Sequence, residues 1–208
     1  KMCNFFKIRV MKKNLFKALT LIAFVALTVA CSKLPQAEID AANLAVQEAK
    51  AVEADVYVPE QFAALQDSVN SSLEMVETQK SKFFKNYKAV TAKLVRDAEL
   101  AAQVKTAAVA KKEEVKAQIV VVSEELAALL VSNKELLTKA PKGKEGKAAL
   151  EAINSELAMI EGAQAEIDAL SAEGKLMDAL NKANAAKEKA QAINAELTEV
   201  IEKYTKKR

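Results

Sequence analysis

Residues 60–140 contain neither glycine nor proline, and this uninterrupted stretch most constrains what the chain can fold into. Along it, apolar side chains recur at alternating steps of three and four residues, for example at Val115, Ile119 and Val122. Such spacing lines one face of a helix, whereas a half-buried strand would alternate at every second residue. The sequence therefore predicts an all-α fold.

The few prolines and glycines elsewhere mark where helices should begin and end. Pro35 and Pro59 suit the first turn of a helix, and the segment 141–146 holds one proline and two glycines, which predicts a turn. The expected helices cover 36–56, 60–140 and 147–205.

The lengths of these helices favour long antiparallel helices that form an elongated coiled-coil-like rod or bundle. The first and third helices together match the second, so each can fold back along part of it, and a narrow apolar stripe suits a two-stranded seam. Such a rod would be about 120 Å long at about 1.5 Å per residue. The alternative is a break near 78–82, where the stripe turns polar, which would give a shorter bundle.

The N-terminal segment has the pattern of a bacterial export signal. Three lysines between positions 12 and 17 precede an apolar run over 18–30, which is shorter than the roughly 20 residues needed to span a bilayer. The run ends in Leu-Thr-Val-Ala before Cys31 and resembles a lipobox. This resemblance implies cleavage before Cys31 and lipidation of its thiol, which anchors the chain to an envelope membrane on the periplasmic side. Ser32 favours the outer membrane over the inner one.

These features predict a division of the chain into six segments. They are an upstream extension over 1–10, a lipoprotein signal peptide over 11–30, a lipid-anchored tether over 31–34, a helical hairpin with one long helix over 35–140, a turn over 141–146, and a C-terminal helix over 147–208 that packs back on the long helix.

The composition argues against an enzyme, a metal or cofactor site, and nucleic-acid binding. The chain has no histidine, and Cys31 is the only cysteine outside the upstream extension, so the commonest general base and most transition-metal ligands are missing. Six of the 31 Lys and Arg residues lie in 1–30, which holds no acid, leaving 25 basic against 28 acidic side chains. That balance lacks the basic surplus typical of nucleic-acid-binding domains.

A Tyr-Val-Pro-Glu turn over 57–60 lies between two Ala-rich helical segments. Over about residues 35–115, the chain resembles a family of bacterial envelope lipoproteins that contain a helical domain of unknown function, which implies a non-enzymatic envelope protein. A glycine common before the tyrosine in that family is replaced by Glu53. Tyr57, Pro59 and Glu60 are interpreted as structural, because proline fixes its own φ and drives the preceding residue towards extended geometry.

Three aromatic residues, Phe83, Phe84 and Tyr87, form a candidate partner surface. Local packing is the preferred interpretation for Phe83 and Tyr87, and the sequence leaves Phe84 open. The segment 202–208 resembles the Lys-Tyr-x-Lys end of lipoproteins joined to peptidoglycan through a terminal lysine. Here the last residue is Arg208, whose guanidinium cannot form that amide. A non-covalent contact with the cell wall or with another envelope protein remains the candidate interaction. The sequence does not determine the oligomeric state.

Together, these features predict a non-enzymatic, lipid-anchored envelope protein that acts as a helical spacer or interaction scaffold. The alternative is a periplasmic carrier or sensor that binds a hydrophobic ligand or a partner protein between its helices. A narrow apolar stripe favours the spacer, because a ligand-binding bundle needs a wider apolar interior.

Overall fold

The computed structural model describes residues 33–141 and 146–206, and the expected signal segment with Cys31 lies outside these ranges. The described part of the chain forms six helices and no strand, which confirms the all-α prediction. The helices are α2 (Gln36–Ala51), α3 (Ala54–Tyr57), α4 (Pro59–Ser81), α5 (Lys88–Lys139), α6 (Gly146–Ala172) and α7 (Leu176–Lys206).

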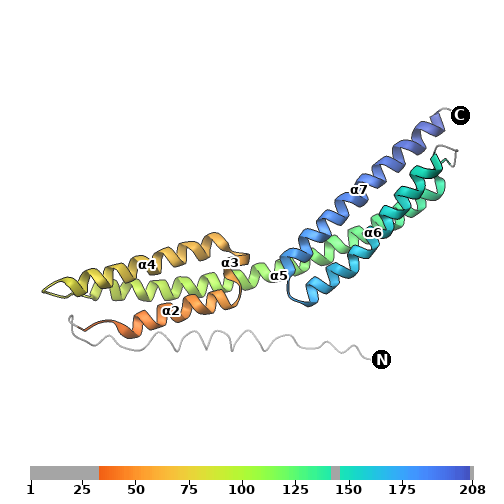
Figure 1. The fold of residues 1–208 in the computed structure, drawn as a ribbon. Coiled ribbons are helices and arrows are strands. Elements are labelled where there is room, and N and C mark those ends of the chain that lie inside the picture. Colours follow the sequence, from red (N-terminus) through yellow and green to blue (C-terminus); the bar gives the residue numbers. More distant parts are fainter. Residues whose placement is uncertain (1–32, 142–145, 207–208) are drawn as a thin grey trace, which may run out of the picture.

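Helix α5 is the common axis of an elongated molecule (Figure 1). Its 52 residues extend about 78 Å at the usual rise of an α-helix. Helices α2 and α4 pack along its first half, and α6 and α7 pack along its second half. Among the described residues, no helix of the first set contacts α6 or α7. We call α2, α3, α4 and α5 up to Lys112 the N-terminal bundle, and the remainder of α5 with α6 and α7 the C-terminal bundle.

One apolar core continues through both bundles. Its members on α5 include Ala101, Val104 and Ala108 in the N-terminal bundle, followed by Val115 and Ile119 in the C-terminal bundle, all buried. The three-four spacing seen in the sequence thus faces α2 and α4 first, and then α6 and α7. A smaller cluster, formed by Ala42, Val76, Tyr87, Val90 and Leu94, closes the outer end of the N-terminal bundle.

The chain does not continue as one helix over 60–140, because α4 ends at Ser81 and α5 begins at Lys88. The interruption lies next to the alternative break near 78–82. Lys82 is extended, and the side-chain oxygen of Asn86 accepts a hydrogen bond from the backbone N–H of Lys88 at 3.1 Å. Asn86 precedes Tyr87, the N-cap residue of α5, and a side chain that bonds to the backbone two residues on gives the chain a local alternative to helix. Helix α4 therefore folds back on α5, and each half of the molecule packs three long helices together instead of forming a two-stranded seam.

The expected C-terminal helix is also interrupted, between Ala172 and Leu176. Gly174 has φ 80°, the left-handed conformation that glycine adopts at low cost. Its N–H donates to the Ser171 carbonyl at 3.1 Å, and the Lys175 N–H donates to the Leu170 carbonyl at 2.9 Å. These two bonds form a Schellman motif, the common glycine-terminated helix end. The chain consequently reverses, and α7 returns along both α6 and α5.

Candidate functional site

Tyr57 lies at the corner where α2, α3 and α4 meet α5. Its ring is buried, and the Lys112 Nζ atom lies 5.4 Å from the ring centroid. Lys112 also pairs with Glu53. Burial raises the pKa of the Tyr57 hydroxyl, and the positive charge of Lys112 opposes that rise. The hydrogen bond that the Lys112 ammonium donates to the Glu53 carboxylate is the main cause of a raised Lys112 pKa.

The backbone at this corner is unusual at Glu53. Glu53 has φ 62° and is the only non-glycine residue with a positive φ in the described ranges. Glycine adopts this left-handed conformation freely, whereas other residues pay of the order of 1 kcal/mol or more. Glu53 thus adopts a conformation that glycine would adopt at lower cost. Its carboxylate gains Lys112 as a partner.

Pro59 and Glu60 are exposed at the start of α4. Val58 is at φ −140°, and its carbonyl accepts the Phe62 N–H at 3.0 Å, so Pro59 occupies a first-turn position at which no N–H is needed. Glu60 places a negative charge near the positive end of the helix dipole. The structural role of Tyr57, Pro59 and Glu60 stays a prediction.

The three aromatic residues of the candidate partner surface are separated by the turn between α4 and α5. Tyr87 is buried in the smaller cluster, as expected. Phe83 and Phe84 are 92% and 85% exposed, and their rings pack edge to face with centroids 5.0 Å apart. The expectation that Phe83 packs against a neighbouring helix is therefore wrong, because the turn points both rings away from the bundle.

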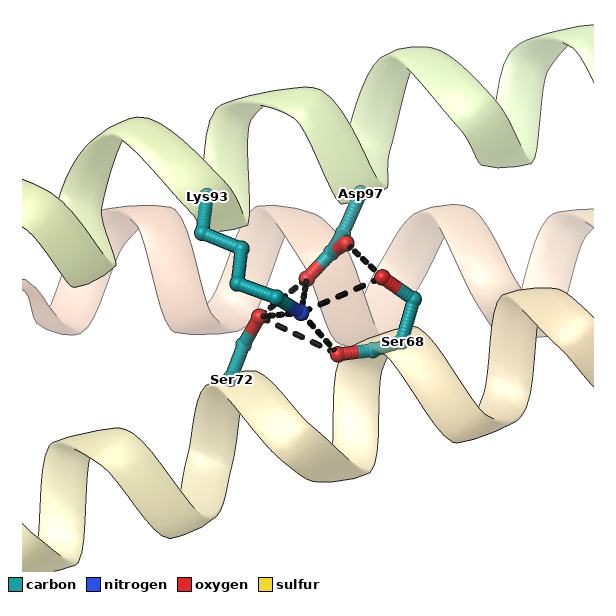
Figure 2. Close-up of polar contacts among 4 residues, drawn as sticks. All are labelled: Ser68, Ser72, Lys93 and Asp97. Atoms are coloured by element: carbon teal, nitrogen blue, oxygen red, sulfur yellow. Dashed lines mark hydrogen bonds and ion pairs between the residues drawn. The ribbon is translucent and has the colours of Figure 1, made fainter.

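A buried polar cluster between α4 and α5 is the most chemically elaborate site in the described residues (Figure 2). Asp97 is 2% exposed and accepts a hydrogen bond from the Ser68 hydroxyl at 2.6 Å and another from Ser72. The Lys93 Nζ atom donates to the Ser72 hydroxyl at 2.8 Å and to the Ser68 carbonyl at 2.6 Å. It also lies 3.8 Å from an Asp97 carboxylate oxygen. We call these four residues the Ser–Lys–Asp cluster.

Serine, lysine and aspartate can together form a nucleophile and its base, but this geometry favours a structural role. The Ser72 side chain is fully buried and donates to the Asp97 carboxylate, so its oxygen is closed to a substrate. It lies in the middle of α4, where backbone N–H groups are bound within the helix and cannot stabilise an oxyanion. An open depression of about 650 Å³ lies beside the cluster. Its wall combines Lys93, Arg96 and Asp97 with four apolar residues, Met75, Ala89, Ala92 and Leu100.

The C-terminal bundle has a neutral counterpart between α5 and α7. Asn133 is fully buried, and its amide donates to the Ala190 carbonyl at 2.7 Å. The Asn194 amide donates to the Asn133 side-chain oxygen at 2.7 Å and to the Ser132 hydroxyl at 3.1 Å. Every buried side-chain nitrogen and oxygen in the described ranges has a partner. Both polar clusters can therefore fix how neighbouring helices align.

Sequence reasoning missed both clusters, although the spacing contained a signal for them. Leu65, Val69, Ser72 and Val76 follow steps of four, three and four, so Ser72 occupies a core position. Asp97 likewise lies three residues after Leu94 and four before Ala101. A polar residue in an otherwise apolar stripe predicts a buried partner on the facing helix.

Two further observations limit the chemistry of the described chain. Residues 33–141 and 146–206 contain no group of three or more acidic or cysteine side chains placed to hold a metal ion. Over the same ranges, none of the helices combines the length and apolar character that crossing a membrane requires.

Comparison with known proteins gives no relative for this chain. No family model matches the sequence, and no curated protein or solved structure shows significant similarity to it.

Proposed function

We propose that this chain is a non-enzymatic, lipid-anchored envelope protein that acts as a helical spacer or interaction scaffold. The observation that carries the proposal is the continuous α5 shared by both bundles. Because α5 runs the length of the molecule, the start of α2 and the end of α7 lie at opposite ends (Figure 1). A lipid on Cys31 would hold the α2 end at a membrane and leave the C-terminal bundle projecting from it.

The packing of α5 supports a rod that resists bending between the bundles. The apolar core crosses the junction along α5. At the junction, Lys105 pairs with Glu48 at 2.8 Å, and Lys112 pairs with Glu53. Further along, Lys187 of α7 pairs with Glu125 at 2.9 Å. Core packing supplies most of the stability, since exposed ion pairs are each worth about 1 kcal/mol or less.

The alternative of a carrier for a hydrophobic ligand gains no specific support from the described residues. The depression beside the Ser–Lys–Asp cluster places Lys93, Arg96 and Asp97 among apolar residues and contains no aromatic side chain. A second one of about 600 Å³ is lined by Asn70, Leu73, Glu74, Glu77 and Thr78. Sites for apolar ligands are mostly lined by apolar and aromatic side chains.

Energy transfer from the two ends of the rod tests the spacer. The full chain is expressed with Ala41→Cys near the start of α2 or Tyr204→Cys near the end of α7, both exposed positions. With Cys31 acylated, the new thiol is the only free one after cleavage of the signal. A dye on Ala41→Cys should transfer energy strongly to an acceptor in the lipid headgroups, and a dye on Tyr204→Cys weakly, because α5 alone spans about 78 Å.

Equal and strong transfer from both positions would mean that the rod lies along the membrane, and would contradict a spacer. The anchor is checked separately by labelling with a fatty-acid analogue. Cys31→Ser should abolish the label, and an equally labelled Cys31→Ser variant would contradict the anchor.

A further inference from the structure

The most exposed apolar side chains of the described molecule lie at one end of the rod, in the turn between α4 and α5 (Figure 1). Phe83 and Phe84 pack on each other, edge to face, instead of on the bundle. Four exposed lysines flank them: Lys80, Lys82, Lys85 and Lys88. The segment 80–88 contains no acidic residue. We call these two phenylalanines and four lysines the aromatic tip.

We propose that the aromatic tip inserts into the surface of the lipid bilayer, as a second membrane contact beside the lipid on Cys31. This inference rests on the anchor of the proposed function and adds to it a defined orientation. Aromatic side chains are favoured at the boundary between headgroups and acyl chains. Lysines around them can pair with anionic headgroups, which attract basic segments at a membrane surface.

The position of the tip, near the start of α2, supports the bilayer as the surface that it contacts. Ile39, in the first turn of α2, packs against the cluster that contains Val76 and Tyr87, so α2 begins beside the turn that forms the tip. Cys31 precedes Leu34 by three residues, which covalent geometry limits to about 11 Å between their Cα atoms. A lipid on Cys31 would therefore bring this end of the rod to the bilayer, and not the end formed by α6 and α7.

Two attachment points would fix the orientation of the rod relative to the membrane, which one anchor would not. A single lipid anchor does not by itself fix the angle between the rod and the membrane. Insertion of Phe83 and Phe84 would fix the end of α4 and the start of α5 at the same surface, which directs α5 away from the membrane. The charge of the tip is positive, because the segment 80–88 has lysines and no acid. The nearest acid before this segment along the chain is Glu77, which pairs with Lys80 at 2.6 Å.

Tryptophan fluorescence gives a direct test, because the chain contains no tryptophan. The full lipidated chain with Phe84→Trp is bound to vesicles of phosphatidylethanolamine and phosphatidylglycerol that contain brominated acyl chains. Val131→Trp, at an exposed position on α5 in the C-terminal bundle, is the matched control. We expect the indole of Phe84→Trp to shift to shorter wavelength and to be quenched by the bromines, and that of Val131→Trp to do neither.

The lysines are tested in the Phe84→Trp background. Lys82→Glu with Lys85→Glu should reduce the quenching, whereas Lys139→Glu with Lys147→Glu, exposed at the far end, should leave it unchanged. Equal quenching in both double variants would overturn the proposed role of the lysines.

The outcomes separate the tip from the anchor. Vesicle-bound protein whose Phe84→Trp indole is not quenched would overturn the tip and leave the anchor intact. If that indole is nevertheless shifted to shorter wavelength, a protein surface covers it, which also overturns bilayer insertion. Protein that takes up no fatty-acid label but is quenched at Phe84→Trp would overturn the anchor and support the tip.

Discussion

The two bundles share one helix but solve the same packing problem with different side chains. The N-terminal bundle buries aromatic residues at its corner, Tyr57 and Phe62, and a charged carboxylate, Asp97. The C-terminal bundle packs α7 through a seam of small residues, Ala179, Ala183, Ala186 and Ala190, and buries the neutral amide of Asn133. Small residues let helices approach closely, whereas a buried charge needs several partners. The same three-four spacing of core positions can therefore be filled by different kinds of side chain in the two bundles.

The largest expected effect comes from separating the two bundles. Ala110 is exposed in α5 near the junction, so Ala110→Pro changes the backbone with little loss of core contact. Proline removes a helical hydrogen bond and clashes with the preceding turn, which should cost about 3 kcal/mol or more. In urea unfolding monitored by circular dichroism, we expect one cooperative transition for the wild type and two for the variant. Ala110→Gly, at about 1 kcal/mol, is the control. One unsplit transition in Ala110→Pro would show that α5 does not couple the bundles.

Removing the buried charge should cost more than removing the buried amide. Asp97→Ala removes the carboxylate that accepts from the Ser68 and Ser72 hydroxyls and that pairs with Lys93. Bonds to charged groups are each worth about 1.5–3 kcal/mol, so we expect a loss of about 3 kcal/mol. Asn133→Ala loses neutral hydrogen bonds and should cost about 1–2 kcal/mol.

Urea denaturation measures both variants, and Glu99→Ala, which removes an exposed carboxylate from the same stretch of α5, should change stability by less than about 0.5 kcal/mol. A larger loss for Asn133→Ala than for Asp97→Ala would reverse the contrast drawn between the bundles.

Alkaline pH should weaken the N-terminal bundle at its corner, with the smallest of these effects. The pKa of Tyr57 is raised by burial and that of Lys112 by its bond to Glu53, so the folded state holds both protons more tightly than the unfolded state does. Stability from both groups is therefore present below about pH 10 and is lost as the pH rises through the raised values. Tyr57→Phe should lose less stability than the wild type between about pH 9 and about pH 11.

The control for this experiment is Tyr204→Phe in the C-terminal bundle, where the hydroxyl is exposed. It should follow the wild type over the same pH interval, as judged by urea midpoints. A Tyr57→Phe variant that declines as steeply as Tyr204→Phe would show that the Tyr57 hydroxyl contributes nothing to the alkaline loss.

Particular elements show how far the sequence could be followed. The absence of Gly and Pro over 60–140 made helix the right prediction, but it did not make that helix continuous. The chain breaks after Ser81 in a polar turn, where the Asn86 side chain accepts a backbone hydrogen bond. Polar residues of this kind are only a weak sequence signal for the end of a helix. Gly174 was a recognisable helix-end signal, yet a lone glycine in a helical pattern does not require a reversal. The exposure of Phe83 depended on that turn geometry, which periodicity does not describe.

The sequence by itself determined that the described chain is all-α, that its apolar stripe follows helical spacing, and that histidine chemistry is absent. These properties follow from local propensity and composition, which each residue contributes without reference to distant ones. Tertiary structure alone decided that α5 serves two bundles, that Asp97 meets Ser68 and Ser72, and that Phe83 and Phe84 are exposed instead of packed on the bundle. Each of those depends on the direction that the chain takes after a turn. Whether a helix continues or the chain reverses is decided by a free-energy difference that packing against residues far away in sequence determines.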